Sequence, residues 1–254
     1  MLRPTLTAAL ALALAAAPAL AHEFIVEPAS TTAAEGTAIG FRILSTHVFF
    51  APEEMEAGTS VTAALHTGSG ATDIALTENP EAQVLEGSAE IAGGTAWIAA
   101  HRLGQVWSKT ADGWIEGGRD AVPDAEFTNK YEKFAKALVN GGDAATATAP
   151  LGHLLEIVPL SDPAAIEAGE DLPVQVLYDG APVAVAVSAT YAGHSDEPEA
   201  YALEAAPEEG ENGPVARVAI STPGLWMLRA EHIAAGSEAF DEHVLRSVLM
   251  FEIE

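Results

Sequence analysis

Short runs of alternating apolar and polar residues, separated by Gly, Pro, Asp and Asn, dominate the chain after residue 22. A period of two residues is typical of half-buried strands, so this pattern predicts a mainly β protein. In the first half, strands are expected at 24–26, 38–44, 60–66 and 95–102. A hairpin is expected where 105–107 and 114–115 flank Asp112-Gly113, a pair suited to tight turns.

One segment, residues 126–140, departs from this alternation. Its apolar and aromatic residues recur at helical spacing: Phe127, Tyr131, Phe134, Leu138 and Val139. Glu126 with Lys130, and Glu132 with Lys136, have the order that stabilises a helix through neighbours four residues apart. Two glycines at 141 and 142 follow as a stop signal. The pattern therefore predicts a single amphipathic helix near 126–140.

Strand patterns resume at 154–160 and continue to the end of the chain. After a linker at 161–169, strands are expected at 174–178, 183–191, 215–220, 225–232 and 243–253. This spacing favours an immunoglobulin-like or transthyretin-like β-sandwich over residues 161–254. The expected organisation is thus a β-rich N-terminal domain at 22–160, which carries the helix, followed by this C-terminal sandwich.

Composition narrows the chemistry. The 254 residues include 37 acidic and 11 basic side chains, for a formal net charge of −26. Such a surface repels phosphate backbones and excludes nucleic acid as a partner. The absence of cysteine excludes disulfides, thiolate zinc sites, iron–sulfur clusters and thiol nucleophiles. The acidity itself fits either adaptation to salt or the attraction of cations.

Residues 1–21 have the features of a secretory signal. Arg3 precedes an Ala/Leu-rich run, and Ala19-Leu20-Ala21 forms the small-x-small pattern of a cleavage site. No later stretch approaches the roughly 20 apolar residues that a membrane-spanning helix needs. We therefore expect a periplasmic mature protein that begins at His22 and has no membrane span.

Cleavage after Ala21 would give His22 a free α-amine beside its imidazole. The amine and Nδ1 of one residue can close a chelate ring on a metal ion, and an amine pKa of about 8 lets a metal displace its proton. His22, His47 and His101 each have the phase of apolar neighbours in their predicted strands. They either converge on one ion or are buried neutral histidines of the core.

The other histidines divide by position. His153 and His243 each stand at the start of a predicted strand, and both are further ligand candidates. His66 has the outward phase of its strand, and His232 shares a face with core residues. His194 lies just before an acidic stretch at 196–211, and we expect both to form a solvated loop.

Several segments, taken together and in order, resemble the NikM/NikK-like family of periplasmic accessory proteins of bacterial nickel and cobalt uptake. The matching segments are HEFIVEP (22–28), THVF (46–49), EEM (53–55), GTA (94–96), HR (101–102), KYEKF (130–134), GHLLEIVPL (152–160), VLYDGAP (176–182), PGLW (223–226) and HVLR (243–246). The resemblance covers nearly the whole chain after residue 21.

This resemblance implies a mostly β periplasmic protein, with a sandwich-like C-terminal region, that handles metal. Its motifs contain His22, His47, His101, His153 and His243, whereas His66, His194 and His232 lie outside them. The leading hypothesis is therefore capture of Ni²⁺ or Co²⁺ for an uptake system that includes a membrane transporter component. Its nitrogen ligands would come from His22, His47 and His101, while His153 and His243 would be reserve or supporting residues. Copper and zinc suit the same nitrogen ligands.

Two other functions fit the sequence. The first is a copper oxidase in which His22 forms a histidine brace, and the second is a metal-free β-sandwich that acts as an adhesion or carbohydrate-binding module. No nucleophile elbow, phosphate-binding glycine loop or zinc-protease motif is present in the sequence. A non-enzymatic role is accordingly the expectation.

Overall fold

The computed structural model describes residues 22–254, so the signal predicted for residues 1–21 lies outside the described residues. Strands account for 56% of the described residues and helical turns for 4%. The helical turns are α1 (Ala144–Ala147) and two 3₁₀ turns at Gly58–Ser60 and Pro163–Ala165. Among these residues no helix is long and apolar enough to cross a membrane.

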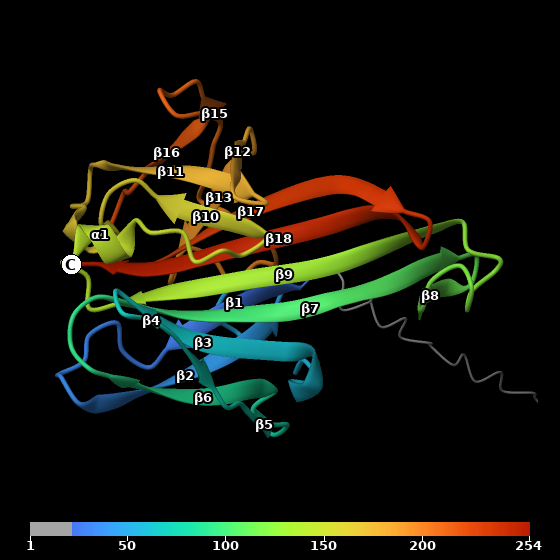
Figure 1. The fold of residues 1–254 in the computed structure, drawn as a ribbon, viewed down its shortest axis with the longest axis horizontal. Helices are drawn as coiled ribbons and strands as arrows, with labels where there is room; N and C mark the ends of the chain where they lie inside the picture. The colour runs from blue at the N-terminus through green and yellow to red at the C-terminus, as the bar shows by residue number, and fades with distance from the viewer. Residues whose placement is uncertain (1–21) are drawn as a thin grey trace, which may run out of the picture.

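Three sheets form three layers (Figure 1). The four-stranded sheet has the order β1 (Glu23–Pro28), β2 (Thr37–Thr46), β6 (Val84–Ile91) and β5 (Thr77–Asn79). The five-stranded sheet has the order β10 (Leu155–Pro159), β11 (Asp171–Tyr178), β16 (Val215–Ala219) and β15 (Pro207–Glu208), with β12 (Ala181–Val183) on β11. The central layer lies between them.

The central nine-stranded sheet has the order β14 (Leu203–Ala205), β13 (Val187–Tyr191), β17 (Gly224–Ser237), β18 (Phe240–Ile253), β9 (Phe127–Val139), β7 (Ala96–Thr110), β3 (Val61–Thr67) and β4 (Gly70–Ile74). β8 (Gly113–Glu116) pairs with β7, which confirms the hairpin predicted at Asp112-Gly113. The sheet takes strands from both sides of the predicted domain boundary at 160–161, because β18 pairs in parallel with β9.

Each face of the nine-stranded sheet packs against its own hydrophobic core. One core joins Trp97, Phe134 and Trp226 to the five-stranded sheet, an arrangement that agrees with the β-sandwich expected for the C-terminal region. The other core joins Ile98 and Ala135 to the four-stranded sheet. Neighbouring residues of one central strand therefore point into different cores, because side chains alternate along a strand.

The helix predicted at 126–140 is wrong. The segment forms β9, a 13-residue strand that pairs antiparallel with β7 and in parallel with β18. A central strand that is buried on both faces does not alternate between apolar and polar residues, so its apolar positions also match a helical spacing. The fold class is accordingly corrected to layered β-sheets, with no amphipathic helix among the described residues.

The burial of two lysines in this segment also contradicts the predicted helix. Lys133 and Lys136, expected on a solvated helix face, are each only 1% exposed. Lys133 Nζ lies 3.8 Å from Glu56 Oε1, and Lys136 Nζ donates to Glu156 Oε1 at 2.6 Å. Burial lowers the pKa of Lys133 to about 8, while Glu56 opposes the shift. Their partners come from other strands and loops, which sequence spacing cannot show.

Opening the buried pair between Lys136 and Glu156 should be strongly destabilising, because either partner alone would leave an uncompensated charge in the core. We expect Lys136→Met or Glu156→Gln each to cost about 3–5 kcal/mol of unfolding free energy. The double variant should cost clearly less than the sum of the two. Urea denaturation of the four proteins measures the coupling, and strictly additive losses would contradict it.

Candidate metal centre

Strand pairing brings His22 and His47 together. In the antiparallel register of β1 with β2, Glu23 lies opposite Thr46, the last residue of β2. The residue before Glu23 therefore lies beside the residue after Thr46. The His22 and His47 ring centroids are 4.0 Å apart, with their planes at 52°. Two imidazoles that are 25 residues apart in sequence thus become neighbours at one end of the four-stranded sheet.

The chain after β2 folds back and adds Glu53 to this pair. The backbone N–H groups of Glu53 and Glu54 donate to the carbonyl of Ser45 at 3.1 and 3.2 Å. The Glu53 Oε2 atom then lies 2.9 Å from His47 Nδ1 and 3.5 Å from His22 Nε2. Its Oε1 atom accepts the backbone N–H groups of His47 and Val48 at 2.8 and 2.9 Å.

These contacts keep Glu53 ionised. Burial alone would raise the pKa of the carboxyl, but the bond to the His47 ring and the two backbone N–H donors lower it to about 2. A carboxylate accepting several N–H bonds behaves in this way because the bonds favour its charged form. Glu53 is thus a fixed anionic ligand at neutral pH.

His22, His47 and Glu53 offer ligand atoms that all lie within 4.8 Å of one another, and no other trio of such residues does so within 22–254. Metal–nitrogen bonds of about 2.1 Å hold two ligands at most about 4.2 Å apart. The trio is therefore close to the spacing of a coordination sphere.

The His22 imidazole is buried and one of its nitrogens is unsatisfied. The residue is 7% exposed, and its Nδ1 has no hydrogen-bond partner among residues 22–254. Glu54 Oε2 lies 3.2 Å from this nitrogen but is not aligned for a hydrogen bond. Burial and the neighbouring His47 lower the pKa of His22, although Glu54 opposes them. A neutral imidazole with a free nitrogen is the form that binds a metal ion.

His101 lies on the other face of the central sheet. It is in register with Phe134, which belongs to the core shared with the five-stranded sheet. Its neighbour Arg102 points to the opposite face, where its Nε lies 3.4 Å from Glu56. The structure thus brings His47 to His22 but does not bring His101 to either. Alternation along β7 predicts that His101 faces a core. Because the central sheet has a core on each face, alternation alone does not show which of the two cores His101 faces.

His101 instead meets His243 on a shared carboxylate. His101 Nε2 lies 2.7 Å from Glu132 Oε1, and His243 Nε2 lies 2.9 Å from Glu132 Oε2. Lys130 Nζ also contacts Glu132 Oε2 at 2.9 Å. Despite burial, these donors lower the pKa of Glu132 to about 2. Because the lysine already neutralises the carboxylate, the cluster resembles a structural link between β7, β9 and β18 more than a cation site.

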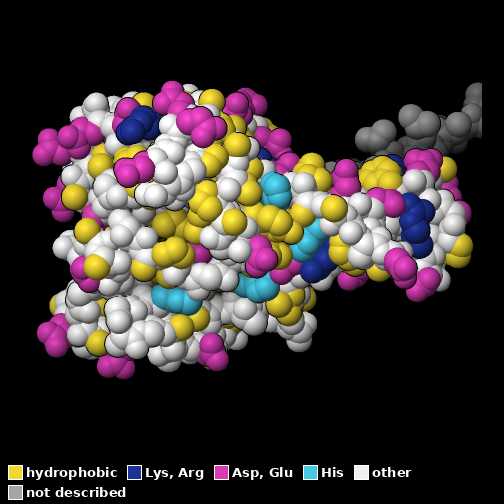
Figure 2. Space-filling view, turned by 45° about the horizontal axis from the view of Figure 1, so that its top comes forward, with side chains coloured by type: hydrophobic (Ala, Val, Ile, Leu, Met, Phe, Trp, Pro, Cys, Tyr) yellow, Lys and Arg dark blue, Asp and Glu magenta, His cyan; other side chains and the backbone are white. Residues whose placement is uncertain are grey.

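The remaining histidines are dispersed. The His153 ring lies 5.2 Å from Phe134, just before β10. His232 packs on Tyr178 at 4.6 Å, and the exposed His194 packs on Tyr191 at 5.2 Å. His66, expected at the surface, is half-buried, and burial lowers its pKa. Figure 2 shows histidines spread among hydrophobic side chains of one face, not gathered at one point.

Nothing in the sequence distinguishes Glu53 from the other acidic residues. Thirty-seven acidic residues make any single carboxylate inconspicuous, and Glu53 entered only as part of a family-like segment. The usable signal is its position six residues after His47, a distance that a reversing loop can close. Glu53 joins the site because that loop is anchored on Ser45.

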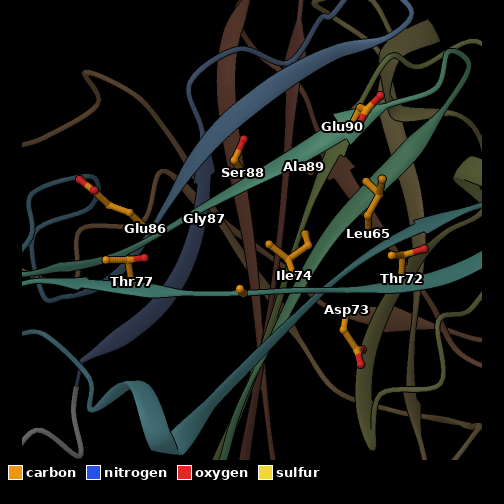
Figure 3. A pocket seen from close by; sticks show the side chains of 11 residues that line it. Leu65, Thr72, Asp73, Ile74, Thr77, Glu86, Gly87, Ser88, Ala89 and Glu90 are labelled. Carbon is orange, nitrogen blue, oxygen red and sulfur yellow. The ribbon is translucent and has the colours of Figure 1, made fainter.

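An open cleft of about 600 Å³ lies apart from the histidines (Figure 3). Leu65 on β3, Ile74 on β4 and Ala89 on β6 form its apolar part, and Glu86 and Glu90 contribute carboxylates. No histidine lines this cleft. The chemistry of the histidine pair is therefore confined to the end of the four-stranded sheet.

Comparison with known proteins places the chain in a family. Residues 19–234 match the model described as "Domain of unknown function (DUF4198)". The chain belongs to the DUF4198 family. No curated protein matches it. The family description assigns no activity, so the site must be interpreted from its own geometry.

Solved structures show only distant similarity. A DUF4785 family protein from Legionella pneumophila is 12% identical, with a TM-score of 0.27 over 87% of this chain and 45% of that chain. The Yersinia pseudotuberculosis adhesin InvE is 14% identical, with a TM-score of 0.23 over 92% of this chain and 59% of that chain. This DUF4198 chain spans less than half the length of the first of them. Scores this low support no functional inference.

Acid should weaken the fold through His153. Burial, the largest cause, lowers the pKa of His153 to about 4, although Glu156 opposes the shift. Because the unfolded value is about 6.5, the contribution of neutral His153 to stability is fully present above pH 6.5 and is lost as pH falls toward 4, since the unfolded chain takes up a proton before the folded protein does. His153→Asn should therefore lose less stability than the wild type between pH 7 and pH 4.5. Urea midpoints at both pH values measure this, with exposed His194→Asn as control, and parallel wild-type and His153→Asn losses would contradict it.

Proposed function

We propose that this DUF4198 protein is a periplasmic divalent-metal-binding protein that captures Ni²⁺ or Co²⁺ for an uptake system. The ion would bind at His22, His47 and Glu53. The observation that carries the proposal is the convergence of two imidazoles and one ionised carboxylate, at a residue whose buried Nδ1 has no hydrogen-bond partner among residues 22–254. Leaving such an atom unpaired is costly unless a partner supplies the missing interaction.

Removal of residues 1–21 is part of the proposal, because it would convert the backbone nitrogen of His22 into a free amine. The amine and Nδ1 then form a six-membered chelate ring with the ion. His47 supplies a second imidazole and Glu53 an anionic oxygen. This donor set suits borderline divalent ions, whereas a cuprous ion prefers the sulfur ligands of Cys and Met.

Two further observations support this assignment. The net charge of −26 raises the local concentration of cations around the protein. Membership of the DUF4198 family is compatible with the NikM/NikK-like resemblance, from which delivery to a membrane transporter component follows as the proposed role. Nitrogen ligands bind copper more tightly than nickel or cobalt, so supply in the compartment would decide which ion is carried.

The decisive test compares protein beginning at His22 with protein carrying one extra glycine before His22. We expect the extension to weaken Ni²⁺ binding at least tenfold, because it converts the amine into an amide that no longer coordinates. His47→Ala should weaken binding by a similar factor, through loss of one ligand. Isothermal titration calorimetry with Ni²⁺ and Co²⁺ measures both effects.

His232→Ala is the matched control, since it removes a half-buried imidazole that packs on Tyr178, in the core shared with the five-stranded sheet, and should leave affinity within twofold. Equal affinities of the cleaved and extended proteins would remove the N-terminal chelate from the site. If the cleaved protein binds none of Ni²⁺, Co²⁺, Zn²⁺ and Cu²⁺, the proposed function itself is wrong.

A further inference from the structure

The residue after His22 is a buried carboxylate with cationic partners on other strands. Glu23 is 2% exposed, and its Oε1 atom accepts Arg229 Nε at 3.2 Å and the Tyr201 hydroxyl at 3.4 Å. Arg246 Nη1 lies 3.6 Å from the same oxygen. Arg229 lies on β17 and Arg246 on β18, so one side chain of β1 connects the four-stranded sheet to the central sheet.

Both arginines also form ion pairs with Glu231. Glu231 Oε2 accepts Arg229 Nη2 at 2.6 Å and Arg246 Nε at 2.8 Å. Glu231 and Arg246 are paired in the β17–β18 register, which fixes their relative position. The guanidinium groups are therefore fixed in position beside Glu23. We call the group of Glu23, Arg229, Glu231 and Arg246 the ionic clamp.

The clamp also contacts His22 directly. Arg246 Nη1 donates to the His22 carbonyl oxygen at 3.4 Å. One guanidinium thus contacts the main chain of His22 and the side chain of Glu23. A strand end ordinarily frays, and a terminal residue does so most. These contacts oppose fraying at the position where the proposed chelate needs a fixed geometry.

Stability alone does not explain the clamp. Replacing a buried ion group by apolar residues of similar volume is often neutral or stabilising, because desolvation offsets the attraction between the charges. Directional bonds from two arginines, in contrast, specify one position for the start of β1. Resting on the proposed function, we infer that Glu23 and Arg246 are positioning residues that preorganise His22 for the metal ion.

Glu23→Gln in protein beginning at His22 tests this inference, since it keeps the shape of the side chain and removes its charge. Ni²⁺ affinity measured by calorimetry should fall about tenfold. The Cu²⁺ electron paramagnetic resonance spectrum should broaden as the His22 ligands lose their single geometry. Arg246→Lys keeps the cation but not the two-point contact, and should give a loss in the same direction if Glu23→Gln does not fold.

Glu156→Gln is the matched control. It also removes a buried carboxylate charge and destabilises the fold, but Glu156 lies on β10 and pairs with Lys136 on the face of the central sheet that packs against the five-stranded sheet. Its Ni²⁺ affinity should stay within twofold of the wild type. The inference is overturned if Glu23→Gln also stays within twofold, or if Glu156→Gln loses as much as Glu23→Gln.

Hydrogen exchange separates this inference from the proposed function. Without metal, Glu23→Gln should speed amide exchange at residues 23–26 at least tenfold more than at residues 174–177 of β11, while Glu156→Gln should show no such excess at 23–26. If the wild type binds no metal but this exchange effect is present, the proposed function fails and the clamp stands as an anchor of the strand end. Unchanged exchange at 23–26 would remove the clamp whatever the metal result.

Discussion

Burial of the nine-stranded sheet on both faces is the constraint on which the rest of the structure depends. Because β9 and its neighbours have a core on either side along their buried parts, a charge buried there needs an opposite charge inside the protein. Lys133 pairs with Glu56, and Lys136 pairs with Glu156. Glu132 contacts two imidazoles and a lysine. The Lys136–Glu156 pair links the five-stranded sheet to the central sheet, whereas the Glu132 cluster joins three strands of the central sheet to one another.

The same constraint separates the histidines into two groups with different chemistry. On the face toward the four-stranded sheet, His22 and His47 flank Glu53, whose carboxylate is held by backbone N–H donors. On the other face, His101 and His243 share Glu132 with Lys130. Two imidazoles and a carboxylate occur in both places. In the second group the ammonium of Lys130 also contacts the carboxylate, whereas in the first the Nδ1 atom of His22 has no hydrogen-bond partner among residues 22–254.

The position of His22 follows from pairing and charge together. The β1–β2 register sets it beside His47, and the ionic clamp fixes it against β17 and β18. The candidate centre is therefore built at the meeting point of two sheets, not in the open cleft beside β4 and β6. A site of this kind needs few residues because rigid strands supply its geometry.

The sequence by itself determined the strand-rich class, the hairpin at Asp112-Gly113 and the choice of His22 and His47 as ligand candidates, because these depend on local alternation, turn chemistry and residue type. Only the tertiary structure decided that 126–140 is a strand, since double-sided burial removes the period that distinguishes strand from helix. It also decided that His101 faces away from His22 and that Glu53 joins the pair. Phase along one strand says which residues share a face, but which layer covers that face depends on how distant segments pack.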